Sequence, residues 1–317
     1  MTKTTQTKKL SRRKWKGTEQ RSDDVFMPVK DARPDDIIIL IMGPTGVGKS
    51  TFVNTATGKQ ETRVGHDLES CTSNIQHVVV PYPPDPSRRL VFVDTPGFDD
   101  TYVDDTEILR RIAVWLARSY SDEMKLTGVI YLHEISQTRM LGTTRKNFMM
   151  FHKLVGAEAA RNVILTSTKW AHIKQEAGRN REEQLVATFW KEMIESGSRI
   201  ARFLGTHESA WEIINLIVER NALEALHIQR ELVDLGKLIP DTEAGNALRL
   251  TLQGLVETHK QTISRLHGRE LDEGGNDDLQ RKLHDTEKQL RELLSQVQNL
   301  KIPFYKRRFP FLRIFHC

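Results

Sequence analysis

The chain has 317 residues, of which 38% are hydrophobic and 28% charged, a composition that excludes collagen, wholesale disorder and a membrane-embedded protein. The formal net charge of +5 is uneven, because residues 1–22 carry eight Lys/Arg against one Glu and residues 301–317 carry five Lys/Arg and no acid. Only two cysteines occur, Cys71 and Cys317, and no apolar stretch follows the basic N-terminus, which favours a cytoplasmic location over secretion. We expect residues 1–35 to form a basic, disordered arm.

From residue 36 to residue 220, short apolar runs alternate with helical patterns, which is typical of a three-layer α/β domain. The expected strands are residues 37–42, 75–80, 90–93, 128–132, 162–165 and 200–204. The expected helices are residues 49–56, 104–120, 143–154, 181–196 and, as one long helix, 209–235. The polar segment 59–74 is expected to be a loop. The fold class is therefore α/β, with a mostly parallel six-stranded sheet.

Beyond about residue 220 only helical periodicity remains, so residues 221–302 are expected to form a helical extension. One helix is expected over 242–266 and another over 276–300, with two glycines between them. The last helix has heptad spacing at Leu279, Leu283, Thr286, Leu290, Leu293, Val297 and Leu300. The preceding helix has a weaker seam at Leu248, Leu252, Leu255, His259, Thr262 and Leu266. Two arrangements compete, an intramolecular hairpin, which the short connection favours, and an intermolecular coiled coil.

Residues 43–51, Gly-Pro-Thr-Gly-Val-Gly-Lys-Ser-Thr, match the phosphate-loop pattern GxxxxGK[ST] between an expected strand and an expected helix. The glycines let backbone amides converge on a β-phosphate at the start of the helix. Lys49 would place its charge on the β- and γ-phosphates, Ser50 would ligate Mg2+, and Thr51 would reach the α-phosphate. The predicted phosphate-binding residues are Gly43, Pro44, Thr45, Gly46, Val47, Gly48, Lys49, Ser50, Thr51 and, from the next motif, Gly97.

The next motif is Asp-Thr-Pro-Gly at residues 94–97, directly after the strand expected over 90–93. Asp94 is placed to hold a magnesium-bound water, and the Gly97 amide to sense a γ-phosphate. In the polar loop between the two motifs, Thr72 is the best candidate for a further magnesium ligand, although its neighbours Ser70 and Ser73 could take the same role. The predicted metal-binding residues are Ser50, Thr72 and Asp94, with Mg2+ as the cofactor.

Together these motifs resemble those of P-loop GTPases of the TRAFAC class, in the septin-like branch with the immune-associated (GIMAP) and chloroplast-import GTPases. Residues 70–72 (Ser-Cys-Thr) resemble the Ser-x-Thr switch of that branch, and residues 94–101 (Asp-Thr-Pro-Gly-Phe-Asp-Asp-Thr) resemble its second switch. Residues 139–140 (Arg-Met) fit the loop after the fourth strand in uncharacterised fungal members. The resemblance covers about residues 36–220 and implies a G domain of the P-loop NTPase fold that binds GTP or GDP with Mg2+.

The group that would activate water for hydrolysis is not identified by this resemblance. Phe98 stands where Ras-like enzymes have the glutamine that orients water, and septin-like relatives also lack that glutamine. A partner subunit could supply the missing group, or a residue of the switch loop such as His66. The catalytic residue is therefore unknown, with His66 as the candidate within this chain.

The segment that would read the nucleotide base departs from the family. The family uses Asn/Thr-Lys-x-Asp after the fifth strand, where the aspartate accepts hydrogen bonds from guanine. Here residues 168–171 are Thr-Lys-Trp-Ala, so the predicted base-binding residues are Thr168, Lys169 and Trp170, and Ala171 replaces the aspartate. A methyl group accepts no hydrogen bond, which leaves the choice between guanine and adenine open. Trp170 could equally be a core residue.

These patterns predict a guanine-nucleotide-binding switch with slow GTP hydrolysis that is assisted by a dimer or another partner. A nucleotide-binding scaffold without hydrolysis and an NTPase of relaxed ATP/GTP specificity are the alternatives. The expected partners are a second copy, through the nucleotide face or the helical region, and an anionic membrane surface contacted by the basic-aromatic tail 303–317. Packing of this tail against the α/β domain is the alternative to a membrane-peripheral location. No nucleic-acid-binding module is recognisable, so nucleic acid is not an expected partner.

Overall fold

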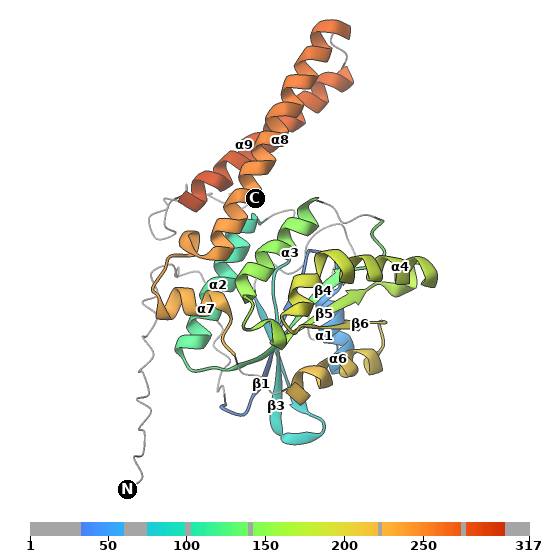
Figure 1. The fold of residues 1–317 in the computed structure, drawn as a ribbon, viewed down its shortest axis with the longest axis vertical. Helices are drawn as coiled ribbons and strands as arrows, with labels where there is room; N and C mark the ends of the chain where they lie inside the picture. Colours follow the sequence, from blue (N-terminus) through green and yellow to red (C-terminus); the bar gives the residue numbers. More distant parts are fainter. Residues whose placement is uncertain are drawn as a thin grey trace, which may run out of the picture.

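A computed structural model describes residues 33–59, 75–98, 103–138, 142–220, 224–273 and 277–301. Within these residues, six strands form one sheet in the order β2-β3-β1-β4-β5-β6 (Figure 1). The strands are β1 (Ile37–Met42), β2 (Gln76–Tyr82), β3 (Asp85–Asp94), β4 (Leu126–Glu134), β5 (Val163–Thr168) and β6 (Arg199–Arg202). Every neighbouring pair is parallel except β2 with β3. The α/β class and the mostly parallel sheet are therefore confirmed.

Strand β1 is apolar along its whole length because both faces of the sheet are covered. Its residues alternate between two cores, with Ile38 and Leu40 in one and Ile37 and Ile39 in the other. All six residues of the strand are buried. A parallel strand that is buried on both faces requires this continuous apolar run rather than an alternating pattern.

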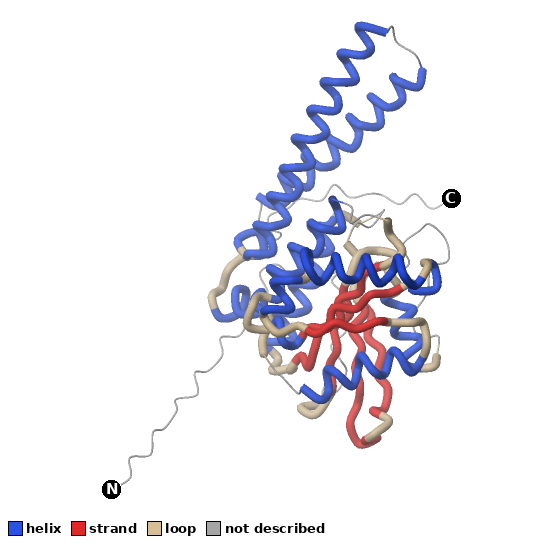
Figure 2. Tube along the Cα trace, turned by 45° about the vertical axis from the view of Figure 1, so that its right-hand side comes forward, coloured by secondary structure: helices blue, strands red, loops and turns tan. Residues whose placement is uncertain are grey.

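Helices cover both faces of the sheet (Figure 2). Core residues of α1 (Lys49–Thr57) and α6 (His207–Arg220) pack on one face, whereas those of α2 (Asp105–Ser121) and α3 (Gly142–Val155) pack on the other. Shorter elements follow: α4 (Gln175–Gln184), a π-helical turn (Leu185–Phe189), α5 (Lys191–Glu195) and 3-10 turns at Ala160–Asn162 and Trp170–His172. The helix expected over 181–196 therefore starts earlier and is interrupted.

The single helix expected over 209–235 is wrong, because α6 ends well before residue 235. The chain later forms α7 (His227–Gln229), a π-helical turn (Arg230–Asp234) and a 3-10 turn (Ile239–Asp241). Leu226 is extended and buried. The Gln229 side chain accepts a hydrogen bond from the Leu226 amide (2.9 Å) and donates one to the Leu116 carbonyl of α2 (3.1 Å). Contacts with α2 thus fix a break that helical periodicity does not reveal.

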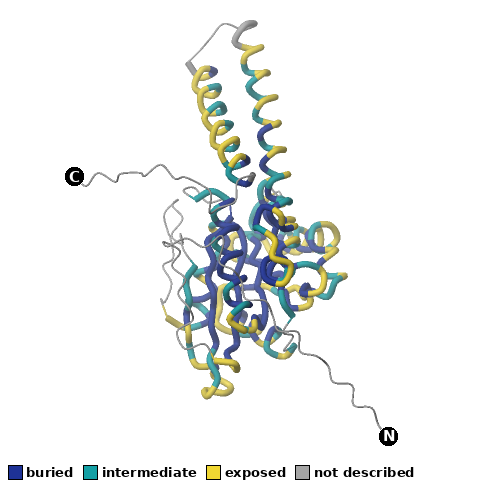
Figure 3. The backbone as a smooth tube through the Cα atoms, turned by 90° about the vertical axis from the view of Figure 1, so that its left-hand side faces the viewer, coloured by how far each residue is buried: buried dark blue, intermediate teal, exposed yellow. Residues whose placement is uncertain are grey.

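The last two helices, α8 (Glu243–Glu273) and α9 (Asp277–Lys301), lie side by side as a hairpin that projects from the rest of the molecule (Figure 1). At its base, Leu248, Leu252, Val297 and Leu300 are buried in the same core as α2 and α3. Toward the tip, most residues are half-buried or exposed (Figure 3). The helical C-terminal region is confirmed, whereas the domain boundaries drawn from the sequence stay predictions. Among the helices of the described residues, none has the length and apolarity needed to cross a bilayer.

A buried carboxylate fixes the start of α8. Glu231 is 0% exposed, and its carboxylate accepts hydrogen bonds from the Lys237 ammonium (2.8 Å) and from the Glu243 amide (3.1 Å). The Thr242 hydroxyl accepts a further bond from the Gly245 amide (3.0 Å), as expected of an N-cap residue. Because a negative charge is favourable at a helix N-terminus, this arrangement sets the direction in which the hairpin leaves the domain.

Two buried histidines predict how stability depends on pH. Burial lowers the pKa of His77, which accepts a hydrogen bond from Trp115 Nε1 (2.8 Å), to about 4, and it lowers the pKa of His133 to about 4. Both side chains are therefore neutral at pH 7, whereas in the unfolded chain they titrate near ~6.5. The unfolded state binds more protons between these values, so the free energy of unfolding should fall by about 2–4 kcal/mol as the pH drops from about 6.5 to about 4.5.

Urea unfolding of the parent at pH 7 and pH 4.5, beside a variant with both His77→Asn and His133→Asn, checks this expectation. The double variant should show a smaller change between the two pH values than the parent. An identical pH dependence in both proteins would show that other groups are responsible.

Candidate functional site

The phosphate loop joins β1 to α1 at the carboxyl end of the central strand. Gly46 (φ 81°) and Gly48 (φ 100°) have left-handed backbone conformations, which glycine adopts without strain. A Cβ atom at Gly43 would lie 2.5 Å from the Leu132 carbonyl oxygen on β4. The loop therefore lies too close to β4 to leave room for a side chain at position 43, and the backbone conformations at positions 46 and 48 favour glycine.

Lys49, the first residue of α1, turns its side chain back over this loop. Its side chain is buried, and Nζ donates hydrogen bonds to the carbonyl oxygens of Gly43 (3.1 Å) and Pro44 (2.9 Å). The other predicted loop residues surround it: Val47 is buried, and Thr51 is exposed on the first turn of α1. The loop thus combines backbone amides at a helix N-terminus with one fixed ammonium group, the donor set that a phosphate needs.

Ser50 and Asp94 meet beside the loop, as the metal prediction requires. The Ser50 hydroxyl donates to Asp94 Oδ2 (2.8 Å), while Oδ1 is buried without a hydrogen-bond partner in the described part of the chain. Burial raises the pKa of Asp94, although the Lys49 charge and the Ser50 hydrogen bond oppose that change. A hydroxyl beside a buried carboxylate with an unsatisfied oxygen is a fitting pair of hard ligands for Mg2+.

Gly97 lies directly against the phosphate loop. A Cβ atom there would stand 2.5 Å from the Thr45 nitrogen and 2.7 Å from Lys49 Nζ. The next residue, Phe98, accepts a hydrogen bond from the Thr45 amide through its carbonyl (2.9 Å), and its side chain is 2% exposed. The second motif is therefore in contact with the first, and the Phe98 ring has a packing role in the core.

On the base side, Thr168 ties β5 to the phosphate loop. Its hydroxyl lies 2.8 Å from the Val47 carbonyl and 3.3 Å from the His133 carbonyl. Lys169 has a left-handed conformation (φ 59°), which is uncommon outside glycine and often marks functional sites. Its Nζ lies 2.8 Å from Glu134 Oε2.

Glu134 was not among the residues singled out from the sequence. Burial would raise the pKa of its carboxyl, but hydrogen bonds from Lys169 and Ser136 and the Lys169 charge hold that pKa below its usual range. The signal that could have identified it is an acidic residue at the carboxyl end of β4, opposite Thr168 in the sheet register. Glu134 places a carboxylate on the predicted base side of the site, where Ala171 has none.

Trp170 is held by the protein itself. The Arg202 guanidinium lies 4.4 Å from its ring centroid, and Trp170 Nε1 donates to the Ser167 carbonyl (3.3 Å). A Cβ atom at Gly178 would lie 2.7 Å from the ring. The structure therefore places Trp170 in the packing between β5, β6 and α4, and Ala171 beside it is exposed.

Two predicted residues, His66 and Thr72, lie outside the described residues, as do Ser70 and Ser73. The structure brings together the phosphate loop, Asp94, Gly97 and the base-side segment 168–170 at one edge of the sheet. Their roles toward a nucleotide stay predictions.

Comparisons with known proteins agree with this geometry. Residues 38–169 match the family model described as 50S ribosome-binding GTPase. The chain is 30% identical over 148 residues to translocase of chloroplast 90 of Arabidopsis thaliana, an alignment that covers 45% of this chain and 17% of that protein. The chain thus spans less than a fifth of that relative's length.

Two crystal structures of Toc33 from Arabidopsis thaliana are similar to this chain. A dimerization-deficient variant gives a TM-score of 0.50 at 16% identity and covers 68% of this chain and 98% of that one. The complex with GDP and Mg2+ gives a TM-score of 0.49 at 17% identity and covers 63% of this chain and 90% of that one. Placement in the septin-like branch stays a prediction. The family match over residues 38–169 and the phosphate-loop geometry together support a P-loop GTPase fold for this part of the chain.

Proposed function

We propose that the protein is a guanine-nucleotide-binding switch that hydrolyses GTP slowly, with help from a second copy or another partner. The observation that carries the proposal is the meeting of Lys49, Ser50 and Asp94 at the phosphate loop. The GTPase family match supports the choice of nucleotide. Toc33, which shares the fold, has been crystallised as a dimerization-deficient variant, which supports pairing of two G domains as the source of assistance.

In this proposal each residue has a separate task. Lys49 and the loop amides hold the β- and γ-phosphates, and Ser50 and Asp94 hold Mg2+, directly or through water. Magnesium, when bound, would neutralise charge on the phosphate oxygens. Because Gly97 already contacts the loop, a γ-phosphate would have to share or displace that contact. Displacement of Gly97 would in turn shift α2, which begins eight residues later. The conformation of the protein would then depend on which nucleotide is bound.

A nucleotide titration tests the proposal most directly. Full-length protein is titrated with GDP, GTP, ADP and ATP in the presence of Mg2+, and affinity is compared with the same titrations in EDTA. Binding of guanine nucleotides that weakens without magnesium supports the switch. Equal affinity for adenine nucleotides would favour the relaxed-specificity alternative, for which Ala171 is the specific reason.

Placing the family's aspartate at position 171 should increase the preference for guanine over adenine nucleotides. Ala171→Asp is expected to raise the preference for GDP over ADP by roughly 1–3 kcal/mol, because a matched hydrogen-bonding group rejects analogues that lack the partner. The measurement is the ratio of the two dissociation constants, with Ala171→Asn as the uncharged comparison. If the ratio does not move, residue 171 does not stand beside the base.

Hydrolysis per subunit is expected to rise with protein concentration if a neighbouring copy completes the site. Phosphate release is followed under single-turnover conditions from about 1 to about 100 μM protein, a range that spans weak dimer affinities. A constant specific activity over this range would argue against assistance by a second copy. Complete absence of hydrolysis at the highest concentration would favour the scaffold alternative.

A further inference from the structure

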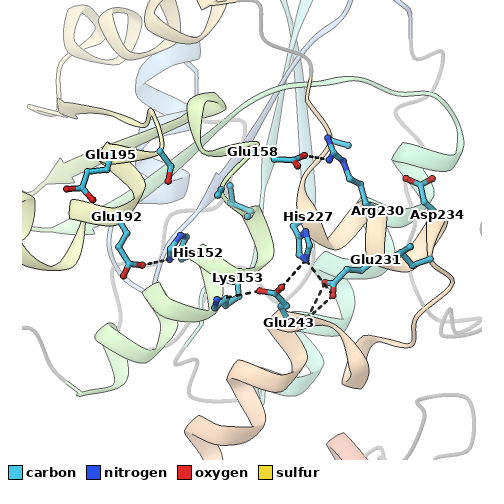
Figure 4. Close-up of a pocket in the computed structure, with 16 residues that line it drawn as sticks. His152, Lys153, Glu158, Glu192, Glu195, His227, Arg230, Glu231, Asp234 and Glu243 are labelled. Carbon is cyan, nitrogen blue, oxygen red and sulfur yellow. Dashed lines mark hydrogen bonds and ion pairs between the residues drawn. The ribbon is translucent and has the colours of Figure 1, made fainter. Parts of the chain in front are cut away.

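A second cleft lies apart from the nucleotide site, where the end of α3 meets α5, α7 and the start of α8 (Figure 4). Its volume is about 840 Å³, within the range of ligand-binding clefts. We call it the α3–α8 cleft; it is lined by His152, Lys153, Val155, Gly156, Ala157, Glu158, Glu192, Glu195, Ser196, Ala225, His227, Arg230, Glu231, Asp234, Leu235 and Glu243. None of these residues belongs to the phosphate or base segments.

The cleft is acidic. Six of its lining residues are carboxylates and two are lysine or arginine, a formal excess of four negative charges with neutral histidines. Burial lowers the pKa of His152, so this imidazole adds no charge at pH 7. Most of these carboxylates have a cationic or imidazole neighbour, such as Arg230 beside Glu158. At the rim, Glu192 lies 3.5 Å from His152 and Glu195 lies 3.9 Å from Lys191, but their side chains are 80% and 65% exposed and so remain open to a further cation.

The cleft also has an apolar part. Leu235 is 63% exposed at its edge, while Val155 at its wall is 0% exposed. Ala157 and Ala225 add further apolar lining. A partner that fits this surface therefore combines positive charge with apolar side chains, which excludes a nucleotide or another small anion.

One segment of this chain has that chemistry, and it starts close by. Residues 303–317 contain five aromatic side chains and four Lys/Arg, with no acid. The last described helix, α9, ends at Lys301, and Leu300 is buried in the same core as Leu248 near the start of α8. The first residue of α8, Glu243, lines the cleft. A fifteen-residue segment spans up to roughly 50 Å when extended, so the tail has ample reach.

We propose that the basic-aromatic tail 303–317 binds in the α3–α8 cleft of its own chain. Its lysine and arginine residues face the rim carboxylates, and its aromatic residues cover Leu235 and the apolar wall. The bound tail would hold α3, α5 and α8 together at the base of the hairpin. It would also be unavailable to an anionic membrane, so a membrane contact of the tail is the competing outcome.

Limited digestion of the full-length chain with chymotrypsin tests the proposal, because the tail carries cleavage sites at its aromatic residues. Cleavage within 303–317, followed by mass spectrometry, should be slow in the parent and at least about fivefold faster in a Glu192→Lys, Glu195→Lys variant, in which two attractions become repulsions. A matched variant, Glu212→Lys with Glu219→Lys, changes two exposed carboxylates on α6 at the opposite face and should be cleaved like the parent.

A second variant, Leu235→Ser, removes only apolar contact and should also speed cleavage of the tail. Unchanged thermal unfolding in each variant shows that the fold is intact. Equal cleavage rates in the parent and both cleft variants would overturn the proposal. So would a tail that is protected only when phosphatidylserine vesicles are added, since the tail would then bind the membrane rather than the cleft.

Discussion

Replacing Lys49 with alanine is expected to lower the affinity for nucleoside di- and triphosphates at least about tenfold, or roughly 1.4 kcal/mol. The Lys49 ammonium is buried and held by two carbonyl groups of the phosphate loop, so its position is fixed before a phosphate arrives. Alanine removes this charge and leaves the backbone amides as the remaining donors. The measurement is the dissociation constant of a fluorescent GDP analogue in the presence of Mg2+.

The control for this variant is Lys125→Ala, which removes an exposed lysine just before β4 and should bind like the parent. Thermal unfolding must accompany the titration, because Lys49 also lowers the pKa of the buried Asp94 and its loss disturbs that carboxylate. A folded Lys49→Ala protein with parental affinity would mean that the loop does not bind phosphate.

Replacing Glu231 with alanine should lower the free energy of unfolding by about 2–4 kcal/mol. The carboxylate is fully buried, so its removal leaves the Lys237 ammonium and the amide at the start of α8 without their charged acceptor. Charge-assisted hydrogen bonds and broken buried ion pairs have costs of this order. Because Lys237 is 39% exposed and can turn to water, we expect the lower part of the range. Urea unfolding gives the value.

Glu257→Ala on α8 is the matched control, because this glutamate is exposed and its loss should change stability by less than about 0.5 kcal/mol. Glu231→Gln keeps an acceptor oxygen without the charge and should fall between the two. Parental stability in Glu231→Ala would show that Glu231 contributes little to holding the hairpin.

The sheet and the phosphate loop could be predicted from the sequence because their signals are local. The run from Ile37 to Met42 identifies a strand buried on both sides. The motif at residues 43–51 already has glycine at the positions where the loop backbone needs it. The break before α7 could not be predicted in this way, since it depends on Gln229 meeting Leu116, more than a hundred residues away. A contact of that range overrides helical propensity.

The candidate site also has a part that local motifs predict and a part that depends on contacts between distant residues. Lys49, Ser50 and Asp94 meet as their motifs predict, because the two loops leave adjacent parallel strands at the same edge. The surroundings of Trp170 are different: its ring is packed by Arg202, thirty-two residues later in the chain. Glu134 is likewise brought to the site by a tertiary contact, since its carboxylate lies 2.8 Å from Lys169 Nζ, thirty-five residues later in the chain. The residues predicted to bind phosphate are therefore located by local motifs, whereas the surroundings of the residues predicted to bind the base are set by tertiary contacts.

The hairpin of α8 and α9 is anchored at one end. Leu248, Leu252, Val297 and Leu300 belong to the same core as α2 and α3, so separating the two helices at their base requires unfolding of that core. Nearer the tip, Leu279 is still buried, but the seam residues Leu266 and Leu283 are only half-buried, and local opening there costs less free energy than at the base. The outer turns of the hairpin can therefore open locally while its base stays folded.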